Sequence, residues 1–410
     1  MTFEELYRTM LKQAVEKGSV QADDLEASAG HLDCLLHPQD HPLVWPLNPC
    51  TCPKEETHCA AACLFDAIVR RDDGTLAVDP DRCSGCGACI QACQSGNLTA
   101  SRDVLPALDA VKHAKGPVYA LIAPAFLGQF STVVTPGRLR SAFKLLGFTG
   151  MVEVALFADL LTLKEALEFD RNIHTETDFQ LTSCCCPMWI GMIRKLYHEL
   201  MPHVPGAVSP MIAAGRTVKK LHPDAVTIFV GPCIAKKAEA READLAGAVD
   251  YVLTFQEMQD IFQAADIHPE LLEESERDHS SRAGRIYART GGVSEAVRTT
   301  VARLHPERPI QVRTRQADGV PACRAMIEDI RSGQHQANFF EGMGCTGGCV
   351  GGPKVLLDRE TGRENVDRYG DEAEFSTPLD NPYVLKLLRL LGFDTVEEFL
   401  EQSDIFIRDF

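Results

Sequence analysis

The chain has 410 residues, of which 45% are hydrophobic, so it can form two or three domains with sizeable cores. Its net charge of −17 argues against nucleic acid or an anionic membrane as the main partner, although an acidic balance serves ordinary solubility equally well. No apolar run approaches the roughly 20 residues that cross a bilayer, and no export signal begins the chain, so a cytoplasmic protein is expected.

Sixteen cysteines are the most informative feature of the composition. In a chain without an export signal, many cysteines indicate metal binding rather than disulfides. Residues 1 to about 30 are expected to be helical, because apolar residues recur near helical spacing from Phe3 to Val15. The segment His31–Pro49 is rich in His and Pro and is interpreted as an ordered linker, in which the lone Cys34 is expected to be structural.

A strong iron–sulfur signal follows the linker. The run Cys83-Ser-Gly-Cys86-Gly-Ala-Cys89-Ile-Gln-Ala-Cys93 has the C-x2-C-x2-C-x3-C spacing of bacterial ferredoxins. In such a run three thiolates hold one cubane cluster, and the fourth cysteine ligates a second cluster. A second cluster is therefore predicted.

The ligands of that second cluster are predicted to come from upstream. Cys59 and Cys63 repeat Cys89 and Cys93 at an offset of thirty residues, which indicates an internal duplication. Pro53 and the residue at 56 stand where the other two cysteines of the repeat are expected, and two nearby cysteines replace them. One [4Fe–4S] cluster is assigned to Cys50, Cys52, Cys59 and Cys93, and the other to Cys63, Cys83, Cys86 and Cys89. His58 is interpreted as a bystander, and 74–80 as a short strand and turn.

From about Ser101 the pattern becomes that of an α/β domain. Strands alternate with helices, which predicts a mostly parallel sheet with ligands bound at the strand ends. The predicted strands are Val118–Ala125 (running into a turn), Met151–Phe157 and Ala225–Val230. Two further short apolar runs are Val249–Leu253 and Ala283–Ala288. The predicted helices are Arg138–Leu146, Ala158–Asp170, Tyr383–Leu391 and one near Thr395–Gln402. Cys323 lies in a helical stretch and is expected in the core.

The chain is thus divided into an N-terminal helical segment and linker (1–45), a small α+β ferredoxin-like domain for two [4Fe–4S] clusters (46–100) and a larger α/β domain (101–410). Within the last, the stretch Glu341–Gly352 places Cys345 and Cys349 four residues apart among glycines, which let backbone approach a bulky inorganic group closely. The remaining thiolates of a cluster are sought in Cys186 and Cys233, each beside a proline. The alternative is that all four are ordinary buried cysteines.

With the ferredoxin run followed by these three cysteine loops, residues 46–352 resemble the [FeFe]-hydrogenases. The resemblance implies mostly parallel sheets in two lobes around a buried H-cluster, a [4Fe–4S] cubane bridged by one cysteine to a diiron subsite that bears CO, cyanide and an azadithiolate. Carried over, the cubane ligands are Cys186, Cys233, Cys345 and Cys349, with Cys349 as the bridging thiolate.

The resemblance also implies roles around the diiron subsite. Lys236 matches the lysine that hydrogen-bonds one cyanide, and Met343 a methionine packed over the subsite. The turn formed by Ala123, Pro124 and Ala125 matches the one that offers backbone to the other cyanide. Cys185 matches the thiol that passes protons to the bridgehead amine. Two glutamates three residues apart on a predicted helix share one face and match the proton-relay glutamates; they are Glu165 and Glu168. The alternative for the two glutamates is a solvated helix face.

The chain departs from the usual family pattern at several positions. Its first loop has three consecutive cysteines, with Cys184 as the extra one, which is typical of the branch with a triple-cysteine loop. Pro205 and Met211 stand where a relay serine and a glutamine are expected, and Gly231 replaces a methionine.

The implied reaction is 2H⁺ + 2e⁻ ⇌ H2, with electrons exchanged with a ferredoxin or a similar small carrier through the two [4Fe–4S] clusters. Dedicated maturation enzymes are implied for the diiron unit. Two other functions are considered: a hydrogen-sensing relative with slow turnover, and an iron–sulfur assembly or electron-transfer protein that lacks the diiron subsite.

Overall fold

The computed structural model describes residues 1–410 except 23–24, 54–56, 72–74, 183–184 and 276–278. The chain begins with α1 (Phe3–Lys17), which starts at a capping box between Thr2 and Glu5 and ends at Gly18, a glycine with φ of +76°. The predicted helix to about residue 30 is therefore too long. The predicted linker is also partly wrong, because α2 (Ala29–Leu36), capped by Ser28, and strand β1 (Val44–Pro46) lie within it.

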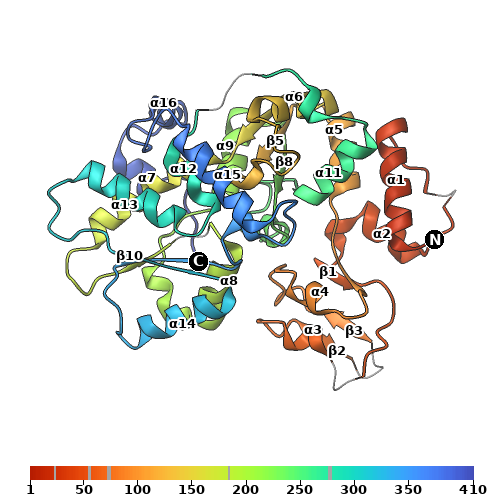
Figure 1. Cartoon of the computed structure of the whole chain (residues 1–410), viewed down its shortest axis with the longest axis horizontal. Helices are drawn as coiled ribbons and strands as arrows, with labels where there is room; N and C mark the ends of the chain where they lie inside the picture. Colours follow the sequence, from red (N-terminus) through yellow and green to blue (C-terminus); the bar gives the residue numbers. More distant parts are fainter. Residues whose placement is uncertain (23–24, 54–56, 72–74, 183–184, 276–278) are drawn as a thin grey trace.

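The ferredoxin-like region contains two antiparallel strand pairs, β1 with β4 (Leu98–Ala100) and β2 (Ile68–Arg70) with β3 (Leu76–Val78). Each half carries a short helix after its cysteine loop, α3 (His58–Ala61) in the first and α4 (Ala88–Ala92) in the second. The predicted strand at 74–80 corresponds to β3, although residue 74 lies outside the described residues. In Figure 1 this region lies below α1 and α2 and beside the α/β body.

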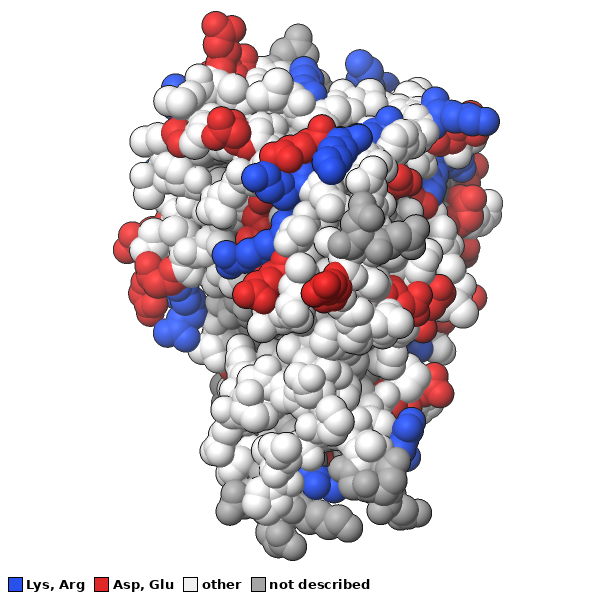
Figure 2. All heavy atoms as spheres, turned by 90° about the vertical axis from the view of Figure 1, so that its right-hand side faces the viewer, with Lys and Arg blue, Asp and Glu red and all other residues white. Residues whose placement is uncertain are grey.

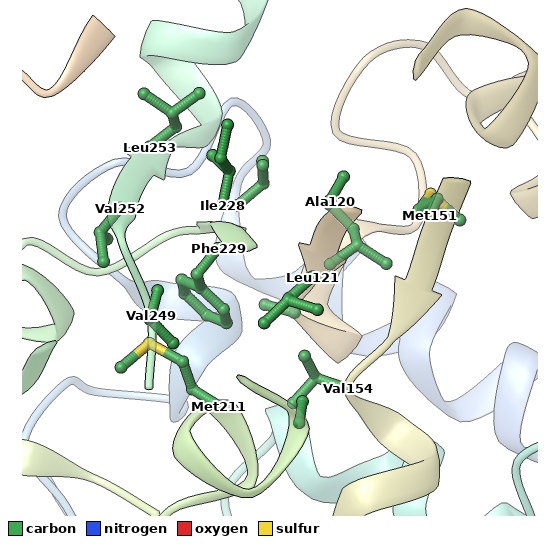
Figure 3. Close-up of a cluster of buried hydrophobic side chains, with 14 of the residues drawn as sticks. Ala120, Leu121, Met151, Val154, Met211, Ile228, Phe229, Val249, Val252 and Leu253 are labelled. Atoms are coloured by element: carbon green, nitrogen blue, oxygen red, sulfur yellow. The ribbon is translucent and has the colours of Figure 1, made fainter. Parts of the chain in front are cut away.

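The first lobe of the α/β body is built on a four-stranded parallel sheet in the order β6-β5-β8-β9. Its strands are β5 (Val118–Ile122), β6 (Gly150–Glu153), β8 (Val226–Gly231) and β9 (Tyr251–Thr254). Strand side chains such as Leu121 and Phe229 pack with Met211 and Val249 in one buried cluster (Figure 3). Such burial on both faces is typical of parallel sheets.

The second lobe contains a three-stranded parallel sheet in the order β10-β11-β7. Its strands are β7 (Gln180–Leu181), β10 (Thr314–Asp318) and β11 (Phe339–Met343). The predicted fold, with mostly parallel sheets in two lobes, is confirmed. Helix α7 (Ala155–Asn172) lies between the lobes and packs against α9 (Pro210–Leu221) on one side and against α12 (Arg282–Arg285) and α13 (Gly292–Leu304) on the other.

The remaining helices cover the sheets and the outside of the body (Figure 1). They are α5 (Val104–His113), α6 (Pro136–Leu146), α8 (Pro187–Leu196), α10 (Ala235–Ala240), α11 (Phe255–Ala264), α14 (Val320–Arg331), α15 (Arg359–Asp371), α16 (Pro382–Leu390) and α17 (Val396–Glu401). Among the described helices, none has the length and apolar character that crossing a bilayer requires.

One predicted boundary is wrong, and one short apolar run takes a form that its sequence pattern left open. The predicted strand Met151–Phe157 ends at Glu153, and α7 already begins at Ala155, because the chain turns into the helix at the end of the sheet. The apolar run Ala283–Ala288 is no strand: it forms α12 and the short helix Ile286–Ala288, whose apolar residues fill the space between α7 and α15. A short buried apolar run does not distinguish strand from helix by its periodicity.

The central strand of the second lobe requires a glycine at position 342. A Cβ atom there would lie 2.0 Å from Cε3 of Trp189, a side chain that is fully buried in α8. Strand β11, which precedes the Cys345 loop, and helix α8, which follows Cys186, can approach this closely only because the glycine has no side chain.

We expect Gly342→Ala to lower the free energy of unfolding by about 1–3 kcal/mol, because the new methyl group displaces the indole ring in a filled core. Thermal unfolding followed by circular dichroism measures this. The matched control is Gly30→Ala in α2, where a Cβ atom meets nothing nearer than Ser28 Oγ at 3.8 Å. An equal unfolding midpoint for the two variants would contradict the expectation.

Candidate metal centre

The cysteine loops of the α/β body all follow the carboxyl ends of parallel strands. Cys186 caps α8 after β7, Cys233 follows β8, and Cys345 follows β11. Ligands of open α/β sheets bind at these ends. Because the two sheets turn these ends toward each other, loops that are far apart in the sequence meet between the lobes.

Four cysteine thiols meet at this point: Cys186, Cys233, Cys345 and Cys349. Burial raises the pKa of the Cys345 thiol, and the other three groups raise it further. Burial likewise raises the pKa of Cys349 to about 12 and of Cys233 to about 11, with Cys186 adding to both. Thiols crowded away from water resist ionisation because each thiolate would lack both solvent and counter-charge. A cationic group bound between them would remove that penalty.

The donor set fits an iron–sulfur cluster better than a single metal ion. Among the described residues, no group of three or more His, Cys, Asp or Glu side chains is arranged to hold a single metal ion. Thiols that face a common centre without touching are what a cubane requires, since the cluster itself lies between its ligands. The backbone N–H of Gly344 donates to Cys186 Sγ at 3.3 Å, as expected of a thiolate ligand held by its surroundings.

Glycines bring these loops together. Gly347 and Gly348 have φ of +86° and +84°, which only glycine adopts readily, and they turn the chain between the last two cysteines. A Cβ atom on Gly352 would lie 2.9 Å from Pro232 Cβ, so the third cysteine loop packs directly on the second. The Asp318 carboxylate accepts from Gly347 N–H at 2.9 Å and fixes the turn to the end of β10.

A largely apolar cavity of about 60 Å³ adjoins the four thiols. Two of those thiols, Cys233 and Cys349, are among its lining residues. Other lining residues are ones singled out in the sequence, namely Ala123, Pro124, Cys185, Lys236 and Met343. Ala125, which belongs to the same turn as Ala123 and Pro124, is buried and is not among the lining residues.

Lys236 points inward rather than to bulk water. It is 8% exposed, and its Nζ donates to Glu239 Oε2 at 2.6 Å. Its positive charge opposes the rise in the pKa of Cys233 and of Cys349. An ammonium group in this position favours negative charge on a group bound in the cavity.

The two predicted relay glutamates lie on α7, and the structure excludes a solvated helix face. Glu165 is 1% exposed and Glu168 is 5% exposed. Glu165 is close enough to Cys185 to raise the pKa of that thiol, after the larger effect of burial. Burial raises the pKa of Glu168, while its ion pair with Lys164 opposes the rise.

Sequence reasoning missed two buried side chains next to these glutamates. Lys164 is 1% exposed and donates to Glu168 Oε1. Tyr287 lines the cavity, accepts a hydrogen bond from Thr162 Oγ1 at 2.9 Å and has a pKa raised by burial and then by Glu165. The i, i+4 spacing of Lys164 and Glu168 was the one available signal. Nothing in the apolar run 283–288 indicated that its tyrosine would face the cavity.

The ferredoxin-like cysteines also lie in two groups. Cys50, Cys52, Cys59 and Cys93 line one small pocket. Burial raises the pKa of Cys89 to about 12, with further contributions from Cys86, Cys83 and Cys63. The internal duplication is visible in the hydrogen bonds: Ala67 N–H donates to Cys63 Sγ and Asn97 N–H to Cys93 Sγ, each at 3.3 Å.

The second of these groups faces the α/β body. Cys86 is close enough to Cys345 to affect its pKa, and a Cβ atom on Gly85 would lie 3.1 Å from Ala235 Cα. We therefore call Cys63, Cys83, Cys86 and Cys89 the inner thiol set, and Cys50, Cys52, Cys59 and Cys93 the outer thiol set.

The remaining cysteines do not belong to these groups or lie outside the described residues. Cys34 is buried near the N-terminal helices, and Cys323 is buried in α14 with its Sγ donating to the Met343 carbonyl at 3.3 Å. Cys184, the extra cysteine of the first loop, lies outside the described residues.

Comparisons with known proteins agree with this geometry. Residues 116–353, more than half of the chain, match the model of the iron only hydrogenase large subunit, C-terminal domain, and residues 76–99 match a 4Fe-4S binding domain. Iron hydrogenase 1 of Clostridium pasteurianum is 28% identical over 275 residues, covering 57% of this chain and 48% of that protein. The NADP-reducing hydrogenase subunit HndD of Solidesulfovibrio fructosivorans is 25% identical over 365 residues, covering 74% of this chain and 62% of that protein.

The chain thus spans about half to three-fifths of the length of these two relatives. Among solved structures, an [FeFe]-hydrogenase from Chlamydomonas reinhardtii superposes with a TM-score of 0.62 at 21% identity, covering 75% of this chain and 98% of that one. At this identity the likeness shows the fold. Together with the family match over residues 116–353, the converging thiols show that this chain belongs to the iron-only hydrogenase family.

Proposed function

We propose that the chain is a hydrogenase that interconverts protons, electrons and H2 at an H-cluster. The observation that carries the proposal is the meeting of four thiols from three loops beside a cavity that Cys185, Lys236 and Met343 line. Family membership alone does not establish the activity, because relatives can keep the fold and lose the chemistry.

In this proposal Cys186, Cys233, Cys345 and Cys349 hold the cubane, and Cys349 is the bridging thiolate. Cys233 and Cys349 both belong to the four-thiol group and line the cavity, and the resemblance selects Cys349 of these two as the bridging thiolate. The bound H-cluster supplies the redox chemistry at iron, which no amino-acid side chain provides.

The side chains around the cavity position and shield that group. Lys236, Ala123 and Pro124 line the cavity and would hold the cyanide ligands of a bound diiron subsite, and the Met343 side chain, 2% exposed, lines it as a soft apolar contact. A dry cavity strengthens the interaction of the Lys236 ammonium with negative charge.

Cys185 and the two buried glutamates supply protons. The Cys185 Sγ holds a proton at the cavity wall, because burial among neighbouring thiols and Glu165 raises its pKa well above the usual range. Glu165 lies next to it, and Glu168 continues the line along α7. Since the pKa of Glu168 is raised, its carboxyl group holds a proton nearer to neutral pH than an exposed glutamate does.

The two ferredoxin-like thiol sets extend the site toward the surface. We propose that each holds one [4Fe–4S] cluster, with the inner set beside the four-thiol site and the outer set toward an external ferredoxin or similar carrier. Maturation enzymes that build the diiron unit are implied as further partners.

The deciding experiment is maturation of the purified chain with a synthetic diiron complex. We expect CO and cyanide bands in the infrared spectrum and H2 formation from reduced viologen, measured by gas chromatography. Bands with turnover far below that of a matured hydrogenase would favour a hydrogen sensor. An infrared spectrum without CO and cyanide bands would favour an assembly or electron-transfer protein and overturn the proposal.

In the matured enzyme, we expect Cys185→Ala to lower H2 production by about 10²–10⁴-fold, because the proton donor at the cavity is lost. The CO and cyanide bands should remain, since Cys185 is not a proposed ligand. The matched control is Cys34→Ala, which removes a buried cysteine of α2 that is distant from Cys185 in the sequence, and it should keep full activity. Unchanged turnover in Cys185→Ala would remove this residue from the proton path.

The assignment of the four thiols as cubane ligands can be tested without an activity assay. When the chain is produced without diiron maturation, we expect Cys233→Ala to lose about four iron atoms, the content of one cubane. Cys323→Ala removes a buried cysteine of the second lobe that is not a proposed ligand and should keep its iron. Iron content by colorimetric assay and electron paramagnetic resonance of the reduced protein provide the readouts. Equal iron in the two variants would contradict the four-thiol assignment.

A further inference from the structure

Arg70 contacts the outer thiol set directly. It ends strand β2, and its Nη2 donates to Cys50 Sγ at 3.6 Å and to the Cys52 carbonyl at 3.0 Å. Its Nε is buried and has no hydrogen-bond partner among the described residues. A guanidinium group therefore lies against two cysteines of one set and keeps a donor for a group bound there.

The internal duplication shows that this cation is specific to the outer set. Strands β2 and β4 occupy equivalent positions thirty residues apart, and the counterpart of Arg70 is Ala100. Near the inner set, Arg82 pairs with Asp79 instead of a thiol. Lys195 lies near Cys83, but its Nζ donates to the backbone carbonyls of residues 81 and 82.

The surroundings of Arg70 increase the electrostatic effect of its positive charge. In Figure 2, which colours Lys and Arg blue and Asp and Glu red, the ferredoxin-like region forms the lower part of the molecule. Arg70 is partly buried, so solvent screens its charge less than that of a surface cation. The cationic form of arginine persists at any pH at which the protein folds.

We propose that Arg70 raises the reduction potential of the outer [4Fe–4S] cluster. Reduction adds one electron, supplied by the external carrier, and increases the negative charge of the cluster and its thiolates. A cation that hydrogen-bonds a thiolate stabilises this reduced form more than the oxidised one, and hydrogen bonds to sulfur are a recognised influence on cluster potential. The outer cluster thereby becomes a better acceptor of electrons from the carrier. The inference rests on the proposed ligand assignment.

The test is a potentiometric titration followed by electron paramagnetic resonance, on the full chain produced without diiron maturation. The midpoint that disappears in Cys59→Ala belongs to the outer cluster. We expect that midpoint to shift to a more negative potential in Arg70→Gln and to stay in place in Arg71→Gln, which removes an exposed arginine from the adjacent position. The other midpoints should be unchanged in both variants.

A second measurement is made first on the unsubstituted protein. Protein labelled with ¹⁵N in the arginine guanidinium groups should show nitrogen coupling to the reduced outer cluster in pulsed resonance spectra, and Arg70→Lys should remove it. An unmoved outer midpoint in Arg70→Gln, or a labelled parent without coupling, would overturn the inference while leaving the hydrogenase proposal intact. If Cys59→Ala removes no cluster, the ligand assignment itself fails.

Discussion

The crowding of buried thiols between two sheets is the constraint on which the rest of this structure depends. Cysteines that bind metal must ionise, yet burial and mutual repulsion raise the pKa of Cys345, Cys349 and Cys233. The fold holds these groups together although they are unfavourable neighbours as thiolates. That arrangement is stable with ionised sulfur only when a cationic group shares the space, so the protein and its cluster are expected to complete each other.

Two features of the fold make such crowding feasible. Parallel strands of both lobes end toward the same point, so short loops after β7, β8 and β11 are enough to bring the cysteines together. Glycines then remove the side chains that would keep these loops apart, as Gly352 does against Pro232 and Gly342 against Trp189. The way the two lobes pack therefore depends on the close approach of the cysteine loops.

Three cationic side chains lie beside the thiol groups or the buried glutamates. The Lys236 ammonium lies beside two of the thiols, the Lys164 ammonium stabilises a buried glutamate on α7, and the Arg70 guanidinium contacts the outer thiol set. In a chain with a net charge of −17, these inward-facing cations are separate from the acidic surface. Each cation lies where negative charge is expected during electron or proton transfer, and low solvent access increases its effect.

Cysteine spacing predicted two sets of four ferredoxin-like thiols and paired Cys345 with Cys349, because ligand spacing reflects the shape of the cluster. Cys186 and Cys233 were added from their neighbouring prolines and from the family resemblance. Alternation of strands and helices likewise indicated the parallel sheets. The contact of Tyr287 with the cavity and the burial of the Lys164–Glu168 pair came from the tertiary structure, as did the helical form of residues 283–288. These features depend on which elements pack on α7, and a local pattern carries no information about a neighbour that is more than a hundred residues away.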